Sequence, residues 1–264
     1  MKHPRLVWFL AGLVCWACAA VCIRNALYLG GSDPTWDRIS EAGVMRVCME
    51  AAYPPFGMTD AAGAFSGFDV DLANELAGRW GVRAEFVNVH FDGLYDALLA
   101  GKCDMILSAL PYDETLTEDV IYSPSYFNAG LLLAVRQEER RIRGVNQLGG
   151  KRVAVELGSA AELEARHHLE QGRIPLEIVT CPGAQEALQA LHDGEVDAAI
   201  ADSVNVYHFA RESGGIRYIK RFLSDEQYVI AVRPGSGYTW KRIADELARL
   251  TRQGFLKTLQ QRWF

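Results

Sequence analysis

The sequence predicts an α/β protein of two lobes, each with a parallel-rich sheet and helices on both faces, joined by two crossing strands that form a hinge. Short apolar segments of strand character alternate with segments of helical spacing from about residue 44. The alternation restarts near residue 153 without an obvious sequence repeat. Apolar segments at residues 130–135 and 228–232 are expected to cross between the two halves.

The pattern in the first half of the sequence predicts three strands with helices between them. A Gly-containing hairpin follows the first strand, and a helix with Asp69 as its N-cap follows the hairpin. The expected order is a helix at 37–42, a strand at 44–49, the hairpin at 59–67, the helix from Asp69, a strand at 84–89, a helix at 92–100 and a strand at 103–108.

The second half predicts the same plan. Its expected elements are a strand at 153–156, a helix from 158–159 to about 170, a strand at 176–179, a helix at 185–192, a strand at 198–201 and a helix opened by Asp202. Two further helices, divided near Gly254, complete the chain.

Composition and charge disfavour several classes of partner and cofactor for this chain. The 264 residues are 50% hydrophobic and 23% charged, which is ordinary globular composition and enough for two lobes with separate cores. The formal net charge of −6 disfavours nucleic acid or anionic lipid as the main partner. Neither a Gly-rich phosphate loop nor zinc-ligand spacing occurs in the sequence, so we expect no cofactor and no metal.

The N-terminal 30 residues have the features of a targeting segment. Lys2 and Arg5 precede an uncharged apolar run at residues 6–23. That run is long for a signal peptide and just long enough to span a bilayer, so residues 1–30 are expected to be either a signal peptide or a membrane anchor. The positive flank places the rest of the chain outside the cytoplasm, in the periplasm or at the outer face of the cytoplasmic membrane.

Three cysteines, Cys48, Cys103 and Cys181, follow this segment, each in or beside an expected strand. An odd number without small-loop spacing does not indicate a disulfide framework. Cys48 and Cys103 are able to face each other if their strands are neighbours, but the main expectation is three buried thiols that act as small apolar side chains.

The turn after the first strand is the leading candidate for a binding site. Glu50 and Tyr53 leave the carboxyl end of that strand just before Pro54 and Pro55 fix the chain direction. Ligands bind at this end of the strands in open α/β sheets. A carboxylate and a phenol there favour a small solute with a donor or a positive charge, although a solvated turn residue is the alternative for Glu50.

Several short motifs occur in a fixed order along the chain: YPPF at 53–56, GFDVDL at 67–72, FDGL at 91–94, GKCD at 101–104, LGGKRVAV at 148–155 and GEVDA at 194–198. Together they resemble the bacterial solute-binding proteins of family 3, the extracytoplasmic receptors of polar amino-acid ABC importers. The resemblance covers about residues 45–264. It implies a type II periplasmic-binding-protein fold, with residues 36–132 and 228–264 in one lobe and residues 133–227 in the other.

The resemblance also implies a site. In amino-acid binders of this family, two acids that match Glu50 and Asp202 hold the ligand ammonium, and aromatic residues that match Tyr53 and Phe91 stack on the ligand. The loop after the third strand and a helix start in the second lobe supply further polar contacts. The expected ligand-binding residues are Glu50, Tyr53, Phe91, Ser108, Leu110, Asp113, Ser159 and Asp202, with no catalytic residue.

The sequence departs from the family pattern where the ligand carboxylate binds. Leu116 stands at the position of the family's arginine, and Pro111 and Asp113 replace the usual Ser and Thr. A guanidinium is the natural partner of a carboxylate, so we expect an amine or guanidine without an α-carboxylate. The open alternative is that another base, such as Lys151 or Arg152, completes an amino-acid site.

The expected function is therefore capture of a small cationic or zwitterionic nitrogenous solute by cleft closure, as a monomer, for an ABC permease. Contact with a membrane is expected only through the N-terminal segment. A ligand-sensing domain for a separate membrane partner is one alternative. A periplasmic dehydratase-like enzyme is less favoured, because its prephenate-like substrates carry two carboxylates and the arginine is missing at Leu116.

Overall fold

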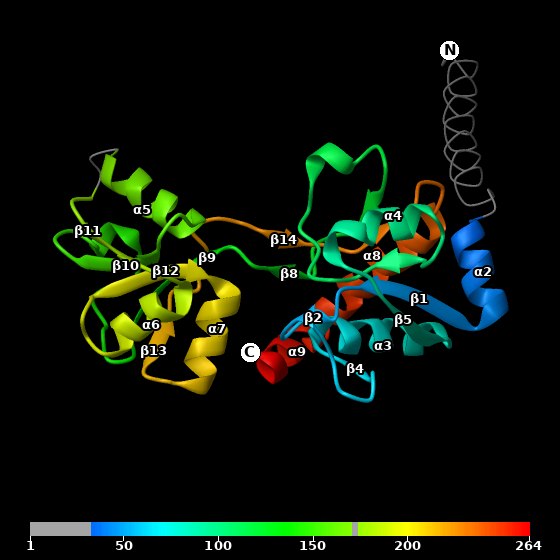
Figure 1. Ribbon diagram of the computed structural model, residues 1–264, viewed down its shortest axis with the longest axis horizontal. Coiled ribbons are helices and arrows are strands. Elements are labelled where there is room, and N and C mark those ends of the chain that lie inside the picture. The colour runs from blue at the N-terminus through cyan, green and yellow to red at the C-terminus, as the bar shows by residue number, and fades with distance from the viewer. Residues whose placement is uncertain (1–32, 171–173) are drawn as a thin grey trace, which may run out of the picture.

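A computed structural model of the chain describes residues 33–170 and 174–264, which form two lobes (Figure 1). The expected targeting segment, residues 1–30, lies outside the described residues. Within the described ranges, no helix combines the length and the apolar character that crossing a membrane requires. The α/β fold of two lobes predicted from the sequence is confirmed.

Lobe one is the part of the chain built on a mixed five-stranded sheet of order β5-β1-β6-β15-β7. Three parallel strands lie side by side, with Val47 of the first opposite Phe86 on one neighbour and Met105 on the other. Two short antiparallel strands complete the sheet. The strands are β1 (Val44–Met49), β5 (Arg83–Asn88), β6 (Met105–Ile106), β7 (Ile121–Tyr122) and β15 (Ala231–Val232).

Helices cover both faces of this sheet and bury a separate core on each. One core lies beneath α3, α8 and α9, and the other lies beneath α4. A small antiparallel sheet precedes α3. The remaining elements of lobe one are α2 (Pro34–Ala42), β2 (Ala52–Tyr53), β3 (Gly57–Thr59), β4 (Phe65–Ser66), α3 (Phe68–Trp80), η1 (Phe91–Gly93), α4 (Leu94–Leu99), η2 (Glu114–Leu116), α8 (Gly237–Arg252) and α9 (Phe255–Trp263).

Lobe two contains a second sheet of order β11-β10-β12-β9-β13, in which β10, β11 and β12 are parallel, β9 is antiparallel to β12, and β13 is antiparallel to β9. Helices again pack on both faces. The elements are β9 (Leu131–Arg136), η3 (Val145–Gln147), β10 (Arg152–Glu156), α5 (Ala160–Glu170), β11 (Glu177–Cys181), α6 (Ala184–His192), β12 (Ala198–Asp202), α7 (Ser203–Glu212) and β13 (Ile216–Tyr218).

Two short antiparallel strands, β8 (Phe127–Asn128) and β14 (Gln227–Tyr228), cross between the lobes (Figure 1). The Asn128 side chain ties the two crossings together, since its Oδ1 accepts from Gly130 N at 2.8 Å and Glu226 N at 3.1 Å. The first crossing, β8, precedes the apolar segment at 130–135, most of which becomes β9 in lobe two. The segment expected at 228–232 overlaps the second crossing only at Tyr228 of β14 and continues into β15 of lobe one. The predicted lobe boundaries stay a prediction.

Aromatic rings pack across the hinge. Phe127 of β8 contacts Phe56 and Phe264 of lobe one at centroid distances of 5.1 and 5.3 Å. Tyr207 of α7 in lobe two reaches the same cluster, 6.0 Å from Phe264. Because edge-to-face and offset-stacked pairs stabilise by about 0.5–1.5 kcal/mol beyond their burial, this cluster couples the lobes next to the crossing strands.

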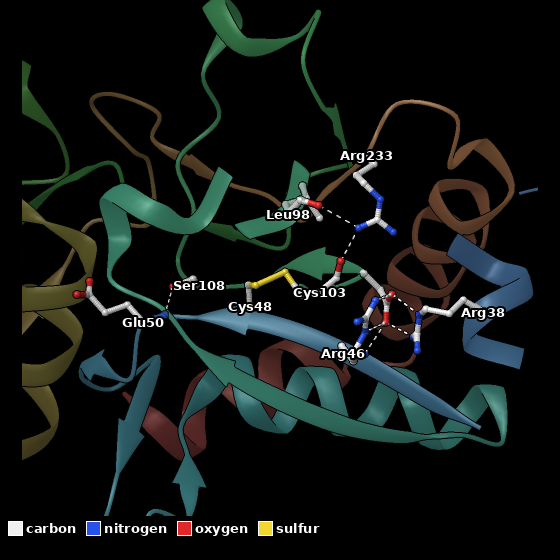
Figure 2. Close-up of a disulfide and its surroundings, with 9 residues drawn as sticks. Arg38, Arg46, Cys48, Glu50, Leu98, Cys103, Ser108 and Arg233 are labelled. Atoms are coloured by element: carbon white, nitrogen blue, oxygen red, sulfur yellow. Dashed lines mark hydrogen bonds and ion pairs between the residues drawn. A yellow bond between two sulfur atoms is a disulfide. The ribbon is translucent and has the colours of Figure 1, made fainter. Parts of the chain in front are cut away.

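Cys48 and Cys103 form a disulfide with an S–S distance of 2.07 Å (Figure 2). The expectation of three buried thiols was therefore wrong for these two residues, and Cys181 is the free cysteine among the residues that the structure describes. The pairing follows from topology: β1 and β6 are neighbours, so Cys48 lies opposite Ile106 and within reach of Cys103, just before β6. The bond fixes the two strands that lead to Glu50 and Ser108.

A charged cluster lies next to the disulfide (Figure 2). The buried carboxylate of Asp104 accepts hydrogen bonds from the side chains of Arg38 and Arg46 and from the backbone N of Arg46 at 2.7 Å. Arg233 donates to the carbonyls of Leu98 and Cys103. Because a buried charge needs partners, this cluster fixes the turn that precedes β6.

Candidate functional site

Glu50 lies at the carboxyl end of β1, where its backbone is held by the neighbouring strand. Its N–H donates to Ser108 Oγ at 2.9 Å, and Ala51 N donates to Asn88 Oδ1 at 3.0 Å. The Glu50 side chain points away from the disulfide (Figure 2) and is 22% exposed. His90 Nε2 lies 3.7 Å from Glu50 Oε1, a neighbour that the sequence did not predict.

Tyr53 presents an aromatic surface next to the hinge. Its ring stacks on buried Phe56 at 5.8 Å with an interplanar angle of 8°, while 44% of the residue stays exposed. Its hydroxyl lies near that of Tyr228 on β14. Burial raises the pKa of both phenols, so they stay neutral and act as hydrogen-bonding groups at neutral pH.

Asp202 places a carboxylate from lobe two close to these phenols. It caps α7 by accepting from Asn205 N at 2.9 Å and from Asn205 Nδ2 at 2.7 Å. Its charge also contributes to raising the pKa of Tyr53 and Tyr228 in lobe one. The predicted acid of lobe two and the predicted aromatic of lobe one therefore lie close together.

Glu226 is an acid at this junction that sequence analysis missed. It lies on the second crossing segment, just before β14, and Ala129 N donates to its carbonyl at 2.8 Å. Loss of hydration raises the pKa of Glu226, and the charge of Asp202 adds to the effect. Asp202 pairs with Leu131, the first residue of β9, which follows the crossing strand β8 in the chain. The two acids thus lie beside consecutive parts of the segment at residues 128–131.

The loop after β6 is positioned by buried Asp69. Asp69 Oδ2 accepts from Ala109 N at 2.6 Å, and Ala109 adopts a left-handed φ of 44°, which is uncommon for a residue with a Cβ. Burial raises the pKa of Asp69 to about 7 against the effect of this hydrogen bond. Asp69 was expected to cap α3, but Gly67 is the N-cap, because the carboxylate makes a tertiary contact instead.

Ser108 and Leu110 flank Ala109 in this loop. The Ser108 hydroxyl is hydrogen-bonded to Glu50 N, as described above. Leu110 is 1% exposed, and its carbonyl accepts from Val229 N at 2.9 Å, so its side chain belongs to the core of lobe one. Only the N–H of Leu110 remains for a ligand.

Asp113 and Ser159 are engaged in local capping. Asp113 Oδ1 accepts from Thr115 N at 2.8 Å and Thr115 Oγ1 at 2.6 Å, which lowers the Asp113 pKa. Ser159 Oγ donates to Glu156 O at 2.7 Å and accepts from Glu162 N at 3.3 Å at the start of α5. Phe91, 38% exposed, opens η1 directly after His90.

Leu116, at the position that the family pattern assigns to an arginine, lies in lobe one just after Asp113. Its side chain packs against the core of lobe one that contains the disulfide. Among the described residues, Asp202 and Glu226 lie near Tyr53, and His90 lies near Glu50. In the described part of the chain, no group of three or more His, Cys, Asp and Glu side chains is arranged to hold a metal ion.

Comparison with known proteins assigns the family. Residues 45–264 match the family of bacterial extracellular solute-binding proteins, family 3. The L-arginine-binding protein of Pseudomonas aeruginosa is 31% identical over 228 residues, which cover 83% of this chain and 87% of that protein. The chain belongs to family 3 of the bacterial extracellular solute-binding proteins, as its motifs predicted.

Solved structures of similar fold include a binding protein and an enzyme. The L-cystine receptor of Neisseria gonorrhoeae, in an unliganded open conformation, superposes with a TM-score of 0.77 at 21% identity, covering 87% of this chain and 96% of that one. The ancestral cyclohexadienyl dehydratase AncCDT-3 superposes with a TM-score of 0.73 at 26% identity, covering 86% and 95%. The fold is therefore shared by proteins with different functions.

Proposed function

We propose that this solute-binding protein takes up a small cationic nitrogenous solute, an amine or guanidine without an α-carboxylate, between its lobes. The observation that carries the proposal is the charge of the junction. Burial raises the pKa of Tyr53 and Tyr228, and the nearby charges of Asp202 and Glu226 add to this rise. The carboxylate of Glu50 follows the end of β1. Leu116 stands at the position of the family's arginine, and its side chain packs against the core of lobe one.

Charge complementarity explains the preference. A cation between these acids gains charge-assisted hydrogen bonds, and a well-placed aromatic face adds about 0.5–2 kcal/mol of cation–π attraction. A carboxylate buried there loses hydration that acids do not replace. Solute contacts with both lobes stabilise the closed arrangement, which an ABC permease would recognise.

The test is a titration with matched solutes. Arginine is compared with agmatine, and lysine with cadaverine, by calorimetry on the purified protein. We expect each decarboxylated compound to bind at least about tenfold more tightly, which corresponds to about 1.4 kcal/mol. Equal affinities within each pair would mean that another base, such as His90, completes an amino-acid site.

An enzyme on this scaffold is the second candidate, because the AncCDT-3 dehydratase shares the fold at 26% identity. A prephenate-like substrate carries two carboxylates, and the acids of this junction repel both. We propose that the chain is not an enzyme. Incubation with prephenate should give no product, and release of phenylpyruvate above the buffer rate would overturn this.

Family membership supports a location outside the cytoplasm. How the protein is held there is a proposal. We propose that residues 1–30 either direct export or tether the protein to the outer face of the cytoplasmic membrane, and that it acts as a monomer. The mass of the mature protein, measured from membrane and soluble fractions, distinguishes cleavage from anchoring.

A further inference from the structure

A cavity of about 430 Å³ lies at the boundary between the lobes. Lobe two contributes α7 and the segment after β13, and lobe one contributes α9. None of the eight predicted ligand-binding residues lines this cavity. Its volume falls in the range of small-molecule sites.

The cavity is lined by three basic side chains and by no acidic side chain. Arg211 and Lys220 come from lobe two, and Lys257 comes from lobe one. Among the described residues, neither lysine has an ion-pair partner, while Arg211 Nε lies 3.6 Å from Glu212 Oε1. In a chain with a formal net charge of −6, this is a local concentration of positive charge.

Contacts between the lobes hold the walls of the cavity in place. Arg211 Nη1 donates to the carbonyl of Arg262 at 2.7 Å. The Tyr207 ring packs edge-to-face on Phe264 at a centroid distance of 6.0 Å. These contacts join α7 to the α9 end of the chain, so the basic groups of both lobes face one space without a ligand having to assemble it.

We propose that this cavity binds a small polyvalent oxyanion, a carboxylate or a phosphate. Guanidinium and ammonium groups are the side chains that recognise such anions, and the amides of Gln260 and Gln261 supply further donors. The anion relieves the repulsion between like charges from opposite lobes. Because it contacts both lobes, it also resists changes in their arrangement. The residues that line this cavity are different from those predicted to contact the solute.

Calorimetry with citrate, inorganic phosphate and acetate at matched ionic strength tests the proposal. We expect citrate and phosphate to bind more tightly than acetate, and their ratio distinguishes a carboxylate site from a phosphate site. Lys220→Gln and Lys257→Gln, which lie on opposite lobes, should each weaken binding of the tighter anion about tenfold. The control Lys241→Gln alters an exposed lysine paired with Asp245 and should change nothing.

The competing explanation is general screening of charge by salt. It predicts that acetate reproduces the citrate and phosphate signals at equal ionic strength and that all three lysine variants behave alike. Either result overturns the proposal, as does the absence of measurable binding of citrate and phosphate at millimolar concentration. Glu50→Gln should leave anion binding unchanged, which separates this cavity from the predicted solute site.

Discussion

Asp69 should make the protein less stable as the pH rises from acid to neutral. Its carboxyl group is fully buried, and burial raises its pKa from the ordinary 3.8 to about 7. A group whose pKa is raised on folding contributes stability that is fully present below about pH 3.8 and is lost as the pH rises through about 7. Asp69→Asn keeps the shape and an oxygen acceptor for Ala109 N but does not titrate.

The magnitude follows from the two pKa values. Each pKa unit is worth about 1.4 kcal/mol, so a rise from 3.8 to about 7 corresponds to about 4 kcal/mol over the whole range. Between pH 5 and pH 8, the linkage relation gives about 3 kcal/mol of lost unfolding free energy. The other carboxylates titrate in both proteins, so the difference between wild type and Asp69→Asn isolates this one group.

The assay is urea unfolding of both proteins at pH 5 and pH 8. We expect the stability of Asp69→Asn relative to wild type to increase by about 3 kcal/mol from pH 5 to pH 8. Asp69→Ala, which cannot accept from Ala109 N, should also weaken solute binding through the loop after β6. A difference between wild type and Asp69→Asn that is the same at both pH values would refute the reasoning.

Three further predictions concern the site and the disulfide. Glu50→Gln and Asp202→Asn should each weaken solute binding by about 1.5–3 kcal/mol through loss of a charged hydrogen bond; unchanged calorimetric affinity in both moves the site elsewhere. Replacing Cys48 and Cys103 by alanine should lower the unfolding free energy by about 4 kcal/mol, because the loop closed spans 55 positions; an unchanged urea midpoint contradicts this. Leu116→Arg should shift the preference from cadaverine toward lysine, and an unchanged affinity ratio argues against it.

The order of strands and helices could be predicted from the sequence because it depends on local patterns. The first strand was predicted at residues 44–49, the range that β1 occupies. Asp202 was predicted to open a helix, and it caps α7 through Asn205 N. Apolar alternation and capping residues act over a few positions, so they can be read directly from the chain.

Features that depend on contacts between distant segments were missed. The disulfide needs β1 and β6 to be neighbours, which spacing alone does not establish. Asp69 was assigned to a helix end because its partner, Ala109, lies 40 positions away. Glu226 was missed because the crossing strand was expected to begin at Tyr228, and the acid gains its neighbours only where the two crossings meet.

The position of β15 in the first sheet has a consequence for the order of folding. β15 lies between β6 and β7, so residues 231–232 must arrive before β7, at residues 121–122, gains its sheet partner. The second sheet is complete by residue 218. During synthesis lobe two can close while lobe one still lacks a strand, and a half-built first sheet exposes an edge that favours aggregation. Chains truncated before residue 231 should therefore retain a folded second lobe, while the sheet of their first lobe stays incomplete.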